Sequence, residues 1–252
     1  MRRAEFDIVA PAGGGPRYLR VPALEEAGVR HGFSCREPAG AARAGVEVGI
    51  QRLAEALGLA ALPRARLRQV HSSQVRLALA ATGADPPEGD ALVTPHDRIA
   101  LAIVTADCVP LLVVAPASGG LAAVHAGWRG TLAGVLAAAI TRLLQETGAD
   151  PASLLVVAGP AIRACCYEVG PEVVSAFVKR DPAASAWFAH PAPGGPKLDL
   201  LAANQAQAAG LGVAAERFLD AGVCTRCRND LFYSYRAEGP GTGRIVTLAA
   251  VL

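Results

Sequence analysis

Residues 105–130, TADCVPLLVVAPASGGLAAVHAGWRG, place an aspartate, a cysteine, a histidine and an arginine among apolar residues. Cys108 directly precedes the apolar run VPLLVV, and His125 lies at the end of the run LAAVH. Continuous apolar runs of this length are typical of buried strands. We therefore expect both side chains to lie at strand ends, where a site can form.

His71, Cys108 and His125 are the sharpest candidate set for a metal site. Zinc takes nitrogen and sulfur ligands, and three protein ligands leave a fourth position for water or substrate. The same residues are also compatible with a core cysteine and hydrogen-bonded structural histidines, and their spacing is not that of a short-range zinc motif.

Cys108 and His125 also permit a different chemistry. In a cysteine hydrolase the histidine takes the thiol proton and the sulfur attacks a carbonyl carbon. A metal site would instead keep the sulfur as a bound thiolate and use water as the nucleophile. The two hypotheses require the same atoms.

The segment GWRGT, residues 127–131, enters a predicted helix with two glycines and an arginine. Backbone N–H groups at a helix start and a guanidinium can bind an anion together. We assign Arg129 and Gly130 to substrate binding on this basis, while the glycines alone would also permit a tight turn with Arg129 on the surface.

Four further cysteines and three further histidines receive no catalytic role. The CxxC of Cys224 and Cys227 lacks a second pair and is interpreted as structural. The adjacent Cys165 and Cys166 are not expected to bind one metal together; one is expected to face the core and one the site. The remaining histidines are expected to be exposed to solvent: His31, His96 and His190.

Hydrophobic periodicity predicts a mixture of strands and helices. Residues 67–79 alternate as a half-buried strand, with Val70 and Ser72 on one face and His71 on the other. Four strands in a row after residue 89 favour antiparallel pairing. The other predicted strands are 89–94, 99–105, 109–115, 120–126, 153–160, 216–222 and 244–251, the predicted helices are 46–57, 127–148, 170–180 and 200–212, and residues 191–196 are predicted to be a surface loop.

The composition fits one α+β domain spanning residues 1–252. Hydrophobic residues make up 52%, and 24 basic against 22 acidic residues leave a net charge of +2. No basic run indicates nucleic acid or an anionic membrane as a partner. The first residues resemble no signal peptide, and six cysteines are too few for a disulfide scaffold, so we expect a cytoplasmic protein.

Several motifs together resemble the laccase-domain family, long called multicopper polyphenol oxidases and now described as purine nucleoside phosphorylases. The resemblance runs from about residue 66 to the C-terminus. The motifs are RQVHSSQV, GDALVT, TADCVPLL, VHAGWRGTLAGV, GPAIRACCYEVG, LDLLAANQAQAAGLGV and FYSYRAEGPGTGR.

This resemblance implies a layered αββα fold similar to the cysteine-hydrolase domain of cytotoxic necrotizing factor. It implies one zinc bound by His71, Cys108 and His125, because these residues match the family's QVHS, TADC and VHAGWRG motifs. It also implies phosphorolysis of adenosine, inosine, guanosine and methylthioadenosine, with deamination of adenosine. The older name implies copper, but one His, Cys, His set has too few ligands for a multicopper centre.

The resemblance suggests roles for further residues. Phosphate is expected near Arg129, Asp107 is expected to accept a proton or fix a ligand histidine, and Tyr235 and Arg236 are expected to line the pocket. The segment HGFSCREPAG follows the family's opening, but Cys35 replaces threonine and EPAGAARAGVEVGI shortens a glycine-rich region that would help shape the nucleoside pocket.

Three functions therefore compete: a zinc-dependent nucleoside phosphorylase and deaminase, a cysteine hydrolase or amidase acting on peptidoglycan precursors, and a binding module without turnover.

Overall fold

A computed structural model describes residues 2–12, 14–37, 45–190 and 193–252. Residues 38–44, part of the segment EPAGAARAGVEVGI, lie outside the described residues. So do residues 191 and 192 of the predicted loop.

The described residues form two main β-sheets that pack face to face, and a short strand pair lies apart from them. The first, sheet A, has the order β1 (Arg2–Arg3), β14 (Phe218–Asp220), β11 (Leu155–Ala158), β9 (Val109–Ala115), β10 (Gly120–Ala126), β7 (Ala91–Thr94) and β6 (Val75–Leu77). The second, sheet B, has the order β2 (Asp7–Val9), β3 (Tyr18–Arg20), β4 (Val29–Ser34), β15 (Ile245–Val251), β8 (Ala100–Thr105) and β5 (Arg64–Ala65). The short pair is β12 (Phe188–Ala189) with β13 (Lys197–Leu198).

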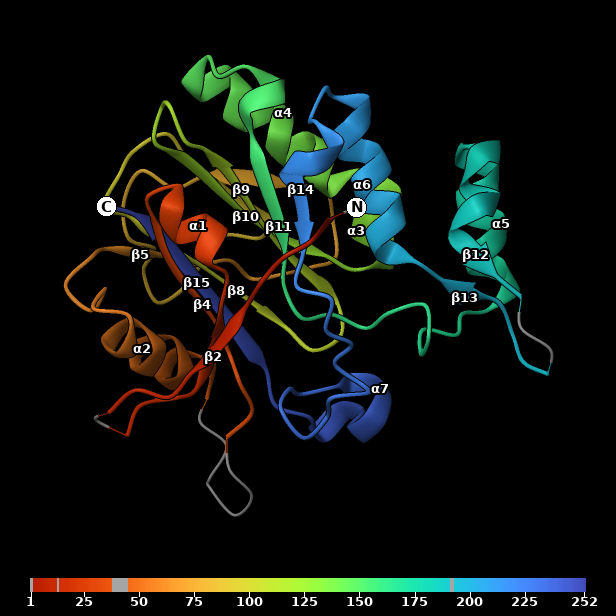
Figure 1. The fold of residues 1–252 in the computed structure, drawn as a ribbon, viewed down its shortest axis with the longest axis horizontal. Helices are drawn as coiled ribbons and strands as arrows, with labels where there is room; N and C mark the ends of the chain where they lie inside the picture. Colours follow the sequence, from red (N-terminus) through yellow and green to blue (C-terminus); the bar gives the residue numbers. More distant parts are fainter. Residues whose placement is uncertain (1, 13, 38–44, 191–192) are drawn as a thin grey trace.

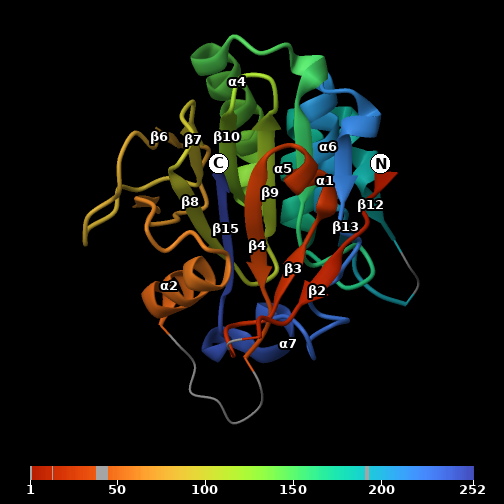
Figure 2. The same ribbon diagram turned by 60° about the vertical axis from the view of Figure 1, so that its left-hand side comes forward.

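Helices cover the outer face of each sheet. Helix α4 (Val135–Thr147) and helix α6 (Leu200–Gly210) pack on sheet A, while α2 (Val46–Ala56) packs on sheet B, on opposite sides of the molecule in Figure 1. The apolar residues between the sheets form the central core, and Figure 2 shows β4 and β15 passing in front of β9 and β10. This order of helix, sheet, sheet and helix explains why β9 and β10 are buried on both faces.

The expected series of antiparallel strands is only partly correct. Strands β7, β9 and β10 pair antiparallel in sheet A, but β8 belongs to sheet B, where it pairs with β15 and β5. The chain crosses from one sheet to the other between β8 and β9, and Asp107 adopts a φ of 90° in this crossing. Cys108 therefore lies where the two sheets meet.

The predicted strand over residues 67–79 is also shorter than expected. Only Val75–Leu77 is a strand, and His71 lies in a bend with a φ of 58°. The Gln69 side chain bonds to both the N–H and the carbonyl oxygen of Val104, each at 2.7 Å. These side-chain bonds take the place of a regular ladder and let the chain turn at His71.

The predicted helix over 127–148 is divided by Gly134, which has a φ of 84°. Helix α3 (Trp128–Ala133) lies before it and α4 after it. The remaining α-helices of the described residues are α1 (Pro22–Glu26), α5 (Pro171–Arg180) and α7 (Tyr235–Glu238). None of the helices in the described ranges has the length and apolar character needed to cross a bilayer.

Candidate metal centre

His71, Cys108 and His125 meet where the two sheets join. His71 comes from the bend before β6, Cys108 directly precedes β9, and His125 is the second-last residue of β10. Strands β9 and β10 are antiparallel neighbours, with His125 opposite Pro110. The expected strand-end positions of Cys108 and His125 are thus confirmed.

One potential ligand atom from each of these residues lies within 4.8 Å of the others. Cys108 Sγ is 4.0 Å from His71 Nε2. The two imidazole rings have centroids 4.9 Å apart and meet edge to face at 76°. His71 is exposed, Cys108 is partly exposed and His125 is buried, so the cluster opens to solvent on the His71 side.

A fully buried carboxylate, Asp90, fixes the positions of both histidines. Its Oδ1 accepts a hydrogen bond from His125 Nδ1 at 2.8 Å and from the His71 backbone N–H at 3.0 Å. Its Oδ2 accepts from the Ser72 N–H at 2.6 Å and from Ser72 Oγ at 2.7 Å. With Nδ1 bonded to Asp90, the Nε2 atom of His125 is left to bind a metal.

The charges around Cys108 favour its thiolate. Burial opposes ionisation, but interactions with His125 and His71 outweigh it and lower the pKa of Cys108 to about 6. Burial alone would lower the pKa of His125, whereas Asp90 and Cys108 raise it to about 9. The thiolate is the form of cysteine that binds metals and attacks electrophiles. The lowered pKa therefore favours the reactive form of Cys108 at neutral pH.

Two glycines allow α3 to approach the cluster. A Cβ at Gly127 would lie 3.0 Å from Cys108 Sγ and 3.0 Å from His71 Cδ2. A Cβ at Gly130 would lie 3.1 Å from the Ser72 carbonyl oxygen. Gly130, predicted as a substrate-binding residue, is buried against the bend that carries His71.

Asp107 bonds to residues other than the two candidate ligand histidines. Its Oδ1 accepts from Thr225 Oγ1 and its Oδ2 from the Arg236 backbone N–H, both at 2.6 Å. Asp107 therefore holds the start of α7 beside the cluster. The carboxylate that contacts His125 is Asp90, which the sequence analysis did not single out although it lies in the quoted GDALVT motif.

Three of the predicted substrate-binding residues are exposed: Arg129, Tyr235 and Arg236. Arg129 is exposed, with its guanidinium carbon 4.3 Å from the centroid of the Trp128 ring. Arg236 Nη1 donates to the Glu168 carbonyl oxygen at 2.7 Å, and Tyr235 is 50% exposed. Among the described residues, no hydrogen bond or ring contact joins Tyr235 to the three candidate ligands.

Tyr167 was not predicted from the sequence as a site residue. Its ring lies 5.2 Å from the Arg236 guanidinium carbon. Burial raises the pKa of its hydroxyl, and the charge of Cys108 raises it further, while Arg236 and Arg129 act in the opposite direction. Tyr167 is thus a protonated phenol within electrostatic range of Cys108 and of both arginines.

The prediction that His31 is exposed to solvent is wrong. It is 0% exposed, and its Nε2 accepts a hydrogen bond from the Val21 N–H at 2.9 Å. The polar residues around it in the sequence do not surround it in the fold, because β4 lies in the middle of sheet B. His96 and His190 are exposed, as predicted.

Comparison with known proteins identifies the family. Residues 28–252 match the family described as multi-copper polyphenol oxidoreductase laccase. The chain belongs to this laccase family. The solved structure of YlmD from Geobacillus stearothermophilus superimposes with a TM-score of 0.83 and 28% identity, covering 97% of this chain and 99% of that one.

Relatives of this chain carry enzyme names. A purine nucleoside phosphorylase of Streptomyces coelicolor is 43% identical over 71% of each chain, and one of Deinococcus radiodurans is 38% identical over 92% of this chain and 91% of its own. A protein named adenosine deaminase RL5, from an unknown prokaryotic organism, is 39% identical over 63% of this chain and 60% of its own.

The three candidate ligands fit a single metal ion. Zinc–sulfur and zinc–nitrogen bonds of ordinary length, arranged tetrahedrally, place sulfur and nitrogen about 3.6 Å apart. The 4.0 Å between Cys108 Sγ and His71 Nε2 is only slightly longer. Since Asp90 already fixes His125, a metal would require only a small shift of these side chains.

Proposed function

We propose that this protein is a zinc-dependent purine nucleoside phosphorylase that also deaminates adenosine. The observation that carries the proposal is the convergence of His71, Cys108 and His125, with Asp90 behind them, in a chain whose relatives bear these enzyme names. The substrates we propose are adenosine, inosine, guanosine and methylthioadenosine, together with phosphate.

Zinc fits the three candidate ligands better than copper. Two imidazoles and one thiolate are ordinary zinc ligands, and a catalytic zinc keeps one coordination position open. The three ligands serve one ion, whereas a multicopper centre requires many more. When bound, zinc would supply a Lewis acid next to the substrate.

Phosphorolysis requires the protein to hold phosphate and to receive the departing base. A phosphate oxygen bonds to the anomeric carbon of ribose, the glycosidic bond breaks, and the base leaves with the electron pair and takes up a proton. Arg129 and Arg236 would hold the phosphate through their guanidinium groups. Tyr167 keeps its proton because burial raises its pKa, so its hydroxyl can donate a hydrogen bond to the base.

Deamination would take place at the same cluster, with water as the second substrate. Water adds to the purine carbon that carries the amino group, and ammonia leaves. Arg129 has no anion to hold in this reaction, so the two activities should depend on it differently. Asp107 would support both reactions by holding α7, and with it Arg236, beside the cluster.

The test is incubation of purified, zinc-loaded protein with adenosine, with and without phosphate. We expect adenine and ribose 1-phosphate only when phosphate is present, and inosine with ammonia in either case. Cys108→Ser should abolish both reactions, whereas Cys35→Ala, at a buried cysteine away from the cluster, is the matched control.

Two results would overturn the proposal. One is a zinc-loaded, folded protein that forms neither product. The other is a metal-free, fully active enzyme in which a thiol-directed reagent traps Cys108, because that result would indicate a cysteine hydrolase.

A further inference from the structure

Four cysteines form a second cluster. They come from two loops that lie far apart in the sequence. Cys165 and Cys166 belong to a turn between β11 and α5, and Cys224 and Cys227 belong to the loop after β14. A parallel bridge between Ala161 and Cys224 aligns the two loops. The cluster therefore follows from the neighbouring positions of β11 and β14 in sheet A.

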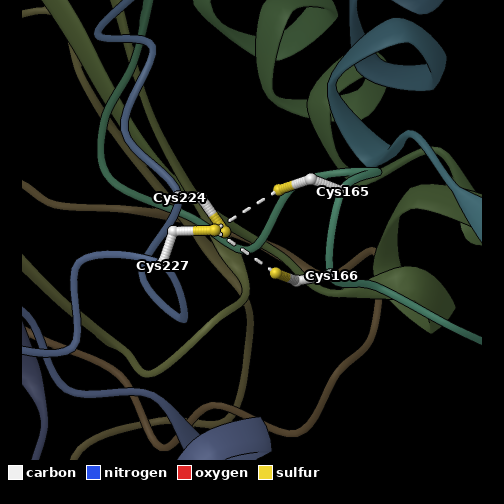
Figure 3. Close-up of side chains that lie close together, drawn as sticks. All are labelled: Cys165, Cys166, Cys224 and Cys227. Carbon is white, nitrogen blue, oxygen red and sulfur yellow. Dashed lines mark hydrogen bonds between the residues drawn. The ribbon is translucent and has the colours of Figure 1, made fainter.

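The four sulfur atoms face one another, as Figure 3 shows. Cys227 Sγ lies 3.7 Å from Cys165 Sγ and 3.4 Å from Cys166 Sγ. All four sulfurs lie within 4.8 Å of one another. The expectation that Cys165 and Cys166 face different parts of the protein is therefore wrong, because the turn directs both side chains toward Cys227.

These distances match those around one tetrahedral ion. Zinc–sulfur bonds of about 2.3 Å place the sulfurs of a tetrahedral site about 3.8 Å apart. The sulfurs are all free thiols, and their separations of 3.4 and 3.7 Å are far longer than a disulfide bond of about 2.0 Å. Four thiolates are typical of zinc and of iron–sulfur centres. Sulfurs that all lie within 4.8 Å of one another enclose a single ion rather than a cluster of several irons, which favours zinc.

The surroundings of the cluster suit a charged metal complex. Zinc with four thiolates carries two negative charges. The Lys197 ammonium donates to the Cys165 carbonyl oxygen at 2.9 Å, which places a positive charge next to the cluster. Cys224 is buried while Cys165 and Cys227 are exposed, so an ion can enter from solvent.

We propose that Cys165, Cys166, Cys224 and Cys227 bind a structural zinc ion, separate from the one at Cys108. Four protein ligands close the coordination sphere, so this ion has no open position for a substrate. The inference depends on these four residues alone and does not require the proposed enzyme activity.

The second zinc would join two loops that reach the first cluster. Tyr167 directly follows Cys166, and the Glu168 carbonyl oxygen binds Arg236. Thr225 directly follows Cys224 and binds Asp107. Zinc at the four cysteines would therefore hold these contacts in place from outside the site.

The test uses a full-length variant in which the first cluster is removed, His71→Ala with Cys108→Ser, purified under reducing conditions. We expect this variant to retain about one zinc per chain, and X-ray absorption at the zinc edge to give four sulfur neighbours at about 2.3 Å. No retained zinc, or zinc bound mainly by nitrogen and oxygen, would overturn the proposal. This variant changes none of the four cysteines, so the result does not depend on their mutation being tolerated.

A second measurement compares variants of the intact chain. Zinc content should fall from two ions per chain to one in Cys227→Ser, and stay at two in Cys35→Ala, the matched cysteine outside both clusters. Two zinc ions in a folded Cys227→Ser protein would contradict the proposal. The zinc counts also show which of the two proposals fails. If only the variant with His71→Ala and Cys108→Ser loses zinc, the protein has the first site alone. If only Cys227→Ser loses zinc, it has the second site alone.

Discussion

Replacing Asp90 with asparagine tests the central claim about the first cluster, that a buried carboxylate prepares His125 for metal binding. Asp90 accepts bonds from His125 and from two consecutive residues of the His71 bend. Burial would raise the pKa of Asp90, but its bonds with His125 and Ser72 lower it to about 2 from 3.8. This shift corresponds to about 2 kcal/mol of stabilisation of the carboxylate.

The Asp90→Asn variant removes the charge and places an amide N–H₂ where an acceptor is needed. Loss of the carboxylate behind a metal-binding histidine typically weakens metal binding 10- to 100-fold. We expect the free zinc concentration for half-maximal activity to rise by about that factor. The thermal unfolding temperature should also fall, because the partly buried N–H of Ser72 loses its acceptor.

The assay follows nucleoside turnover in zinc buffers set by a chelator, alongside circular dichroism to confirm folding. Ser72→Ala is the matched control: it removes one hydroxyl bond to Oδ2 and leaves the bond between His125 and Oδ1. It also removes the acceptor of the Gln74 N–H. It should change the half-activating zinc concentration by less than about threefold, since Asp90 itself loses only one neutral donor. A folded Asp90→Asn protein with the zinc dependence of the wild type would refute the reasoning.

Three further predictions follow from the contacts of single residues. Gly127→Ala should lower activity and zinc affinity at least about tenfold, because its Cβ meets Cys108 and His71 at 3.0 Å; Gly210→Ala, with open space at its Cβ, should leave both unchanged. Arg129→Ala should raise the KM for phosphate about tenfold or more while adenosine deamination stays within about twofold; equal loss of both activities would contradict this, and Arg142→Ala on α4 is the control. Burial lowers the pKa of His31 to about 4, so the stability that this neutral histidine contributes is present above about pH 6.5 and is lost as the pH falls. Urea unfolding should show that the wild type loses about 2 kcal/mol more than His31→Asn between pH 7.5 and 5, and parallel losses would exclude this role.

The sequence was sufficient to predict which three residues meet at the first cluster and most of the strands and helices around it. Cys108 and His125 could be placed because the apolar runs beside them are long and end at those residues. Helix α2 was predicted for 46–57 and is observed over Val46–Ala56. These features depend on local patterns, which a single sequence displays directly.

The other features depend on contacts between distant segments. Asp90 could not be chosen, because its importance comes from bonds to His125, 35 residues away, and to the bend at His71. The bend itself depends on Gln69 bonding to Val104, also 35 residues away. The four-cysteine cluster likewise requires β11 and β14 to be neighbours, a pairing that no local pattern indicates.

The same bonds make the first cluster a connection between the two sheets. His125 is part of sheet A, whereas the His71 bend is bonded through Gln69 to β8 of sheet B. An ion that holds His71 would also strengthen the contact that Gln69 makes with β8, so its binding energy opposes the separation of the two layers. Metal-loaded protein should therefore unfold as one cooperative unit, and chelation should allow sheet B to exchange its amide hydrogens before sheet A does.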